Sequence, residues 1–294
     1  MLIMCGMAAG FSALFGTPAA AAVFAIEVTV VGIAHYSAIV PCLLSSLTAA
    51  MVADWFHVKP TSFLVRYIPE FHADSYFMLA RTIIMGIAGA IVSIVFCKIM
   101  SKTAELYKKY IKNPYLRILA GGAIVAAISM LIYALTGSFD YNGAGTDIIK
   151  KAFIGQSRPE AFILKMLLTA LTLGCGFKGG EIVPSLYIGA TFGCFFGGLL
   201  GLSHSFGAAV GLAAVFCGVT NCPFATLLLT IELFGADGLP YYALVIGISY
   251  MLSGYTGLYS AQKFYDNKFI HRRFRHLKTY KEIKTDSAAN NGKD

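Results

Sequence analysis

The sequence carries little charge for its length. Only 13% of its 294 residues are Asp, Glu, Lys or Arg, whereas 57% are hydrophobic and the mean hydropathy is +0.70. Soluble domains have about 25% charged and about 45–50% apolar residues, so this composition disfavours a soluble globular protein. It predicts a polytopic α-helical protein embedded in a lipid bilayer.

Motifs for metal binding and catalysis are also missing. The seven cysteines are scattered, mostly within apolar runs, and none stands at metal-ligand spacing with histidines nearby. The six histidines form no visible cluster, and no nucleophile lies in a recognisable motif. We therefore expect no enzymatic activity, no metal and no cofactor. The cysteines are interpreted as small buried hydrophobic residues.

The N-terminus lacks charge altogether. Residues Met1 to Ile26 contain no charged side chain. A signal peptide would begin with a basic region and lead to a cleavage site, and neither is evident. The chain starts as if inside a membrane segment, so we expect it to be N-terminally truncated.

Apolar runs bounded by charges, Pro and Gly make up most of the chain. They are Met1–Ile26, Ala38–Trp55, Tyr76–Ile99, Leu116–Leu135, Phe162–Phe177, Pro184–Leu202, Phe206–Val219, Pro223–Phe234 and Tyr241–Leu258. A membrane-spanning helix needs about 20 residues. Two runs meet that length, but several are shorter and interrupted by Gly or Pro. Short, broken segments are typical of transporters, where backbone lines a cavity.

Basic residues gather in two places. One is the tail after Gln262, and the other lies between two long runs and consists of Lys98, Lys102, Lys108, Lys109, Lys112 and Arg117. The positive-inside rule places both on the cytoplasmic side. We predict a transmembrane domain over residues 1–262 and a basic cytoplasmic tail over residues 263–294, whose end TDSAANNGKD is expected to be disordered. Nucleic-acid binding by the tail is the disfavoured alternative.

One internal repeat is visible. In GTPAAAAVFAIEV a glutamate, Glu27, follows Pro18 by nine positions, and in TNCPFATLLLTIEL Glu232 follows Pro223 by the same spacing. Internal repeats are typical of transporters. The alternative is two unrelated apolar helices that each begin with proline. We expect Thr17 to cap the first of these helices through its side chain.

The stretch GFKGGEIVPSLYIGATFG, from Gly176 to Gly193, places two glycines and two charges before an apolar helix. Pro184 suits the first helical position, which makes Val183 the predicted N-cap. Valine has no side-chain acceptor or donor, so the first backbone N–H groups lack a local partner. An anion would satisfy them at the positive end of the helix dipole. Gly179 and Gly180 let the backbone approach such an ion, although a tight turn alone would also explain them.

The two charges beside these glycines allow more than one interpretation. Glu181 either complements the helix dipole or carries a proton, since ionisable groups at membrane depth are costly and usually functional. Lys178 either pairs with an acid or attracts anions to the site. The sequence leaves both questions open.

Several segments in order resemble the CLC family of chloride channels and anion/proton antiporters, over nearly all of Met1 to Ser260. GMAAGFSALFGTPAAAAVFAIE is similar to the family's paired dimer-interface helices, and GGEIVP stands where the family has its Gly-x-Phe-x-Pro anion-binding loop. GYTGLYSAQKF is similar to the end of the family's last helices, and Tyr259 occupies the position of a tyrosine whose hydroxyl contacts the central anion.

The resemblance implies an all-α fold, an inverted repeat of short, tilted and broken helices whose first repeat is incomplete. It assigns anion binding to Gly179, Gly180, Glu181, Ile182, Val183 and Tyr259, with Glu181 as the candidate for proton coupling. It also implies a homodimer. The helices expected at the contact lie near Pro18–Glu27, Ala38–Ala53, Pro223–Glu232 and Tyr241–Ser253.

Three departures from the family pattern bear on the activity. Two anion-binding segments, one with the gating glutamate, would lie upstream of Met1. Val28 occupies the place of a second glutamate that chloride/proton antiporters carry. Glu181 resembles the fluoride/proton antiporter branch, but that branch commonly has threonine where this chain has Val183.

These observations predict a multi-pass protein of the cell membrane with a cytoplasmic C-terminus. Its expected partners are small inorganic anions, the lipid bilayer and a second copy of itself, without nucleic acid. We expect a chloride channel or a chloride/proton exchanger. The alternatives are a fluoride/proton antiporter and a nonconducting, truncated fragment. The transported ion, chloride or fluoride, would be the only ligand.

Overall fold

The computed structural model describes residues 1–58, 63, 65–69, 76–266, 268, 273–280 and 282–283. The first part contains α1 (Leu2–Phe15), α2 (Pro18–Glu27), β1 (Val30–Val31), η1 (Tyr36–Ala38), α3 (Ile39–Trp55), α4 (Tyr76–Tyr110) and α5 (Pro114–Thr136). The second part contains α6 (Thr146–Phe153), α7 (Ala161–Gly174), α8 (Ile182–Leu199), α9 (His204–Thr220), α10 (Pro223–Phe234), α11 (Leu239–Leu252), β2 (Lys263–Asp266) and β3 (Arg273–Thr279). The predicted all-α class is confirmed, because the strands are few and short.

Most predicted apolar runs form helices, with informative differences at their ends. The run Met1–Ile26 divides into α1 and α2 because Gly16 adopts a left-handed conformation with φ 66°. Helix α4 continues past Ile99 to Tyr110, since the Lys, Glu, Ala and Met residues there favour helix. Helix α6 was not predicted, because it is short and amphipathic rather than apolar.

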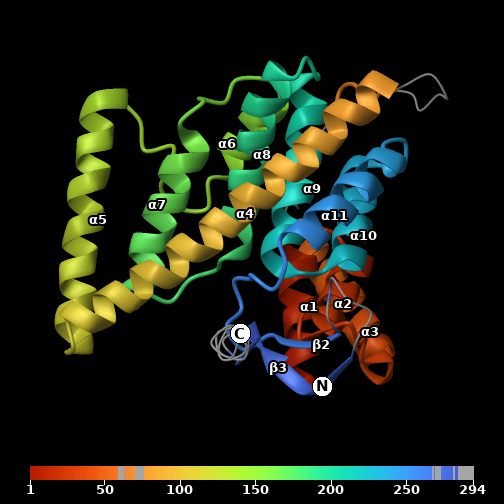
Figure 1. Ribbon diagram of the computed structural model, residues 1–294, viewed down its shortest axis with the longest axis horizontal. Helices are drawn as coiled ribbons and strands as arrows, with labels where there is room; N and C mark the ends of the chain where they lie inside the picture. The colour runs from red at the N-terminus through yellow and green to blue at the C-terminus, as the bar shows by residue number, and fades with distance from the viewer. Residues whose placement is uncertain are drawn as a thin grey trace, which may run out of the picture.

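Helices α8 and α9 form the centre of the molecule. Every residue of α9 from Ser205 to Thr220 is buried. The two helices approach closely through glycine: a Cβ added to Gly193 would lie 2.2 Å from the carbonyl oxygen of Gly207 and 2.8 Å from the Cα of Gly211. Figure 1 shows α4 crossing the molecule diagonally, α5 at one edge, and α1–α3 beside α10 and α11.

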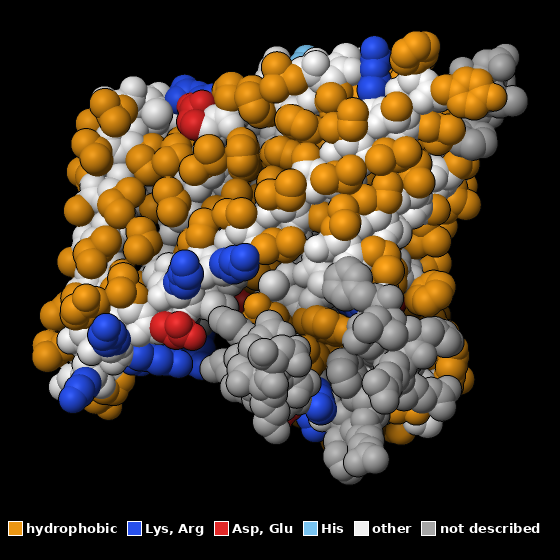
Figure 2. Space-filling view, in the orientation of Figure 1, with side chains coloured by type: hydrophobic (Ala, Val, Ile, Leu, Met, Phe, Trp, Pro, Cys, Tyr) orange, Lys and Arg blue, Asp and Glu red, His pale blue; other side chains and the backbone are white. Residues whose placement is uncertain are grey.

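The helix lengths fit a membrane protein. Among the described residues, four segments are long and apolar enough to cross a bilayer, in α3 with η1, α4, α5 and α8. Six further apolar helices have only 10–17 residues. Figure 2 shows hydrophobic side chains covering most of the visible face, with Lys and Arg gathered where α4 ends and α5 begins. The predicted mixture of full and short segments is therefore present.

The predicted repeat appears as two matching helix corners. Before α2, Gly16 has φ 66° and ψ 30°, and Thr17 has φ −122° and ψ 73°. Before α10, Asn221 has φ 58° and ψ 32°, and Cys222 has φ −118° and ψ 78°. In both corners a left-handed residue ends one helix and the next helix begins with proline two residues later. The closely similar backbone angles of the two corners show that the repeat is structural.

The two repeat glutamates cap each other's helix. The Glu232 carboxylate accepts hydrogen bonds from the N–H groups of Ala19 at 3.0 Å and Ala20 at 2.8 Å, at the start of α2. The Glu27 carboxylate accepts from Phe224 at 3.2 Å and Ala225 at 2.8 Å, at the start of α10. Because each glutamate lies toward the end of its own helix, α2 and α10 run antiparallel.

The expected side-chain cap by Thr17 is wrong. Thr17 is the N-cap residue of α2 but makes no side-chain capping bond. Its hydroxyl oxygen is buried and has no hydrogen-bond partner among the described residues. The Glu232 carboxylate already occupies the N–H groups that a capping threonine would bind, because an N-cap acceptor bonds the second or third helical N–H.

A small sheet closes the chain onto the end of α2. Strand β2 pairs in parallel with β1, with Val30 opposite Lys263, and antiparallel with β3, with Lys263 opposite Thr279. Both β2 and β3 lie in the predicted tail, where no strands were predicted. The division at residue 262 remains a prediction, and the expected disordered end, residues 285–294, lies outside the described residues.

Candidate functional site

Helix α8 begins two residues earlier than predicted. Its first residue is Ile182 and its N-cap is Glu181, so Pro184 is the third helical residue and Val183 is not the cap. The first intrahelical bond runs from the Ser185 N–H to the Glu181 carbonyl oxygen at 3.2 Å. Proline is compatible with this position because none of the first three helical N–H groups has an intrahelical acceptor.

The start of α8 nevertheless has free donors. Glu181 makes no side-chain capping bond. Within the described part of the chain, the backbone N–H groups of Ile182 and Val183 have no hydrogen-bond acceptor. Pro184 has no N–H to donate. Two backbone donors therefore stand at the positive end of the helix dipole, which is the arrangement that binds anions at helix N-termini.

All six predicted site residues line one cavity of about 510 Å³: Gly179, Gly180, Glu181, Ile182, Val183 and Tyr259. The remaining lining is apolar and comes from α1 and α2: Met7, Gly10, Phe11, Leu14, Phe15 and Phe24. The structure thus brings Tyr259 to a loop about eighty residues before it in the sequence. In the described part of the protein, the Tyr259 hydroxyl has no hydrogen-bond partner. It is available to donate to a bound anion, and anion binding here stays a prediction.

The two charges of the loop lie in different surroundings. Glu181 is half-buried on the cavity, whereas Lys178 is exposed. No ion pair between Lys178 and an acid is present among the described residues. A carboxyl group that lines the same cavity as two free N–H groups and a phenol can take up and release a proton beside the path of an ion.

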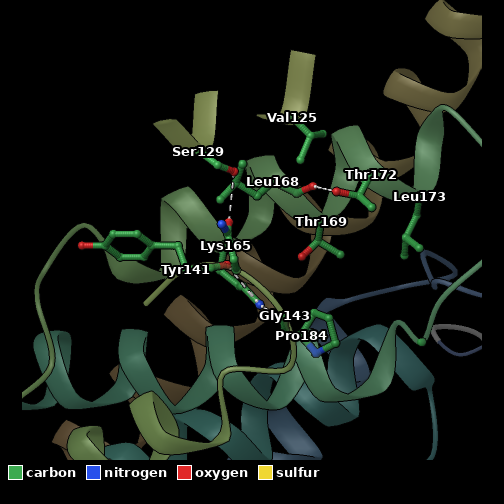
Figure 3. A pocket seen from close by; sticks show the side chains of 12 residues that line it. Val125, Ser129, Tyr141, Gly143, Lys165, Leu168, Thr169, Thr172, Leu173 and Pro184 are labelled. Carbon is green, nitrogen blue, oxygen red and sulfur yellow. Dashed lines mark hydrogen bonds between the residues drawn. The ribbon is translucent and has the colours of Figure 1, made fainter. Parts of the chain in front are cut away.

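A second cavity lies on the other side of the same loop. It has a volume of about 330 Å³ and shares Gly180 and Pro184 with the α8 start. Its charged lining residue is Lys165, which is only 2% exposed. Figure 3 shows this side chain among Ser129, Tyr141 and Gly143, with Pro184 nearby.

The Lys165 ammonium is held by neutral groups. Its Nζ donates to the carbonyl oxygens of Tyr141 at 3.2 Å and Gly143 at 2.5 Å, and it lies 4.9 Å from the centre of the Tyr187 ring. No carboxylate pairs with it in the described part of the chain. Burying an unpaired charge is costly, so an anion in this cavity would be favoured.

Lys165 is not among the residues that the sequence motifs predict for the site. The signal was present, because Lys165 is the only charged residue in the apolar run Phe162–Phe177. Charges inside membrane segments are rare and mark ion pathways by default. The cavity that it shares with Gly180 and Pro184 could not be read from the sequence, since α7 and α8 are separate helices.

Comparison with known proteins identifies the family. A model of the voltage gated chloride channel family matches residues 1–254. The "Chloride/fluoride channel protein" of Pseudomonas syringae pv. tomato is 34% identical over 269 residues, which cover 90% of this chain and 58% of the relative.

Solved structures give the same result. The crystal structure of a CLC-type fluoride/proton antiporter matches with a TM-score of 0.82 at 32% identity, covering 90% of this chain and 65% of that one. A slow cyanobacterial Cl⁻/H⁺ antiporter matches with a TM-score of 0.70 at 20% identity, covering 86% and 60%, which supports the fold alone. The chain thus spans about three fifths of these proteins. It is a multi-pass membrane protein, and it belongs to the voltage gated chloride channel (CLC) family that its motifs resemble.

Proposed function

We propose that this chain belongs to a transporter that moves small inorganic anions across a lipid bilayer, and that an anion occupies the Glu181 cavity. One observation supports this most. Tyr259 lines the same cavity as the start of α8, where two backbone N–H groups are unpaired among the described residues. A dehydrated anion needs several such donors around it. The buried Lys165 on the other side of the loop adds positive potential along the same path.

Fluoride is the first candidate ion and chloride the second. This order reverses the prediction from the sequence alone, in which chloride comes first. Two relatives above 30% identity carry fluoride in their names, one as a chloride/fluoride channel protein and one as a fluoride/proton antiporter. Glu181, on the cavity, is the residue that resembled the fluoride branch. Together these observations favour fluoride.

Glu181 is proposed to couple anion movement to protons. Ionised, its carboxylate repels an anion in the cavity that it lines. Protonated, the same group donates a hydrogen bond and attracts the anion. Anion binding and protonation at Glu181 would therefore be linked, each changing the affinity for the other by the same factor.

The test is flux from liposomes that contain the purified chain. Wild type is expected to release fluoride down its gradient and to move protons in the opposite direction, as read by a fluoride electrode and a pH electrode. Glu181→Gln should abolish proton movement. The matched control is Glu105→Gln on α4, an exposed glutamate outside both cavities. Unchanged proton coupling in Glu181→Gln contradicts the role of Glu181, and no anion flux from wild type supports the nonconducting alternative.

We further propose residence in the cell membrane as a homodimer, with the C-terminus in the cytoplasm. The basic side chains where α4 meets α5 support this orientation by the positive-inside rule. Protease added to sealed right-side-out vesicles should leave the residues after Lys263 intact. Their removal would reverse the proposed orientation.

A further inference from the structure

Tyr259 lies in a stretch without regular secondary structure. Helix α11 ends at Leu252 and β2 begins at Lys263, so no helix fixes the tyrosine at the Glu181 cavity. The stretch is attached to the end of α9 by a backbone bond from the Leu258 N–H to the Val219 carbonyl oxygen at 3.0 Å. Two buried side chains, Asn221 and Gln262, attach it further.

Asn221 provides the first of these attachments. It ends α9 in a left-handed conformation and is fully buried. Its Nδ2 donates to the Thr256 carbonyl oxygen at 3.0 Å and to Oε1 of Gln262 at 3.1 Å. The two hydrogens of one amide therefore bind the chain on both sides of Tyr259.

Gln262 extends the network to α2. Its side chain is 3% exposed, and its Nε2 donates to the carbonyl oxygens of Val28 at 3.0 Å and Thr220 at 2.8 Å. Val28 is the residue that follows α2. Gln262 thus ties the Tyr259 stretch to the ends of α2 and α9 at once.

Lys268 completes the network. Its Nζ donates to Oδ1 of Asn221 at 2.5 Å and to the Tyr250 carbonyl oxygen at 3.0 Å, and it lies 3.9 Å from the centre of the Tyr250 ring. An ammonium on Oδ1 fixes which end of the Asn221 amide accepts and which end donates. Hydrogen bonds that run in one direction through buried groups reinforce one another.

We propose that Asn221, Gln262 and Lys268 are positioning residues that hold Tyr259 on the Glu181 cavity. The effect of this network on anion binding rests on the proposed function, in which the Tyr259 hydroxyl donates to the anion. Its geometry is independent of any ion. The packing leaves little tolerance: a Cβ on Gly257 would lie 2.8 Å from Nδ2 of Asn221 and 3.2 Å from Oε1 of Gln262.

The test places 3-fluorotyrosine at position 259 of the full chain and records its ¹⁹F resonance in micelles, first without halide. One narrow resonance is expected in wild type. Gln262→Met keeps the length of the side chain but cannot form these hydrogen bonds, and Asn221→Asp removes both N–H donors. Each variant should shift the resonance, broaden it or add a second one. Lys268→Met, at a half-buried position, provides a third variant if either of these fails to fold.

Ser249→Ala is the matched control. It removes one buried hydrogen bond, from Oγ to the Ala214 carbonyl oxygen at 2.6 Å, without touching the Tyr259 stretch. Its resonance should match wild type. A resonance that stays unchanged in all three network variants overturns the proposal, as does an equal change in the control.

Halide titration separates this proposal from the proposed function. Potassium fluoride and potassium chloride are added in turn to the same samples. Wild type should respond, and the network variants should need about three- to tenfold more halide, the factor given by loss of about one hydrogen bond. If wild type responds to neither salt, anion binding at Tyr259 is wrong, while the ion-free spectra still decide whether the network holds Tyr259.

Discussion

At the scale of single residues, two lysines, one buried and one half-buried, have carbonyl oxygens rather than carboxylates as partners among the described residues. Lys165 is 2% exposed and sits beside the loop before α8, within a helix of the membrane domain. Lys268 lies beyond α11 and donates to Asn221, which in turn binds the Tyr259 stretch.

Lys268 should make stability depend on pH. Burial lowers its pKa from an ordinary value near 10.5 to about 7. Among the described residues, the groups that face it are Asn221, Tyr250, Tyr255 and the thiols of Cys217 and Cys222, and none of these is a carboxylate. The unfolded chain therefore binds more protons than the native state between about pH 7 and about pH 10.5, so stability rises with pH across that interval.

Thermal unfolding in micelles measures this effect. The wild-type midpoint should increase from about pH 7 toward about pH 9.5, and Lys268→Met should flatten that slope. Lys178→Met is the control, because Lys178 is exposed and unpaired among the described residues. Parallel slopes for wild type and Lys268→Met would contradict the prediction.

The sequence allowed Glu181 and Tyr259 to be placed at one site only through the family resemblance. Asn221 and Gln262 escaped notice because their partners are distant along the chain. The bond between them joins residues 41 apart, and that from Gln262 to Val28 joins residues 234 apart. Local spacing contains no information on such pairs, which depend on the folded arrangement of α2, α9 and the Tyr259 stretch.

At the scale of elements, proline indicates that a helix begins but not at which residue. Helix α10 starts at Pro223, as predicted, whereas α8 starts two residues before Pro184. Both positions satisfy the same rule, because the first turn of any helix leaves its N–H groups unpaired. The anion hypothesis is compatible with the earlier start of α8, because free backbone N–H groups are present at the first turn in either case.

The equal Pro–Glu spacing did predict the repeat. It could not show that the glutamate of each helix caps the start of the other helix. Each carboxylate binds two N–H groups of the other helix. Changing Glu27 or Glu232 to Gln leaves one acceptor oxygen and removes the charge that complements the dipole. We expect a loss of about 1 kcal/mol for each, as for other N-cap changes.

Denaturant titration in micelles tests this coupling of α2 and α10. Glu27→Gln should lower the free energy of unfolding more than Glu232→Gln does, because Glu27 is half-buried and Glu232 is exposed. Glu105→Gln, at an exposed position of α4, should leave the midpoint within error of wild type. Losses no larger than that of the control would mean that the two caps do not stabilise the repeat.

At the scale of the whole molecule, the four helices expected at a dimer contact pack into one group. Helix α2 contacts α3 and α10, and α10 contacts α11. Leu44 on α3 is 60% exposed and Phe224 on α10 is 71% exposed. Helix association inside membranes depends on close packing rather than on burial from water, so truncating such side chains should weaken a dimer that uses them.

We therefore expect Leu44→Ala with Phe224→Ala to shift the protein toward monomer in liposomes. Loss of about 1–2 kcal/mol of packing would lower the lipid-to-protein ratio at half-dissociation about five- to thirtyfold. Counting photobleaching steps of single labelled subunits, at increasing dilution in lipid, gives that ratio. The matched control is Leu131→Ala on α5, which has the same 60% exposure as Leu44 but lies at another edge of the molecule. Single steps from wild type at every dilution would contradict the homodimer, and an equal shift in the control would place the contact elsewhere.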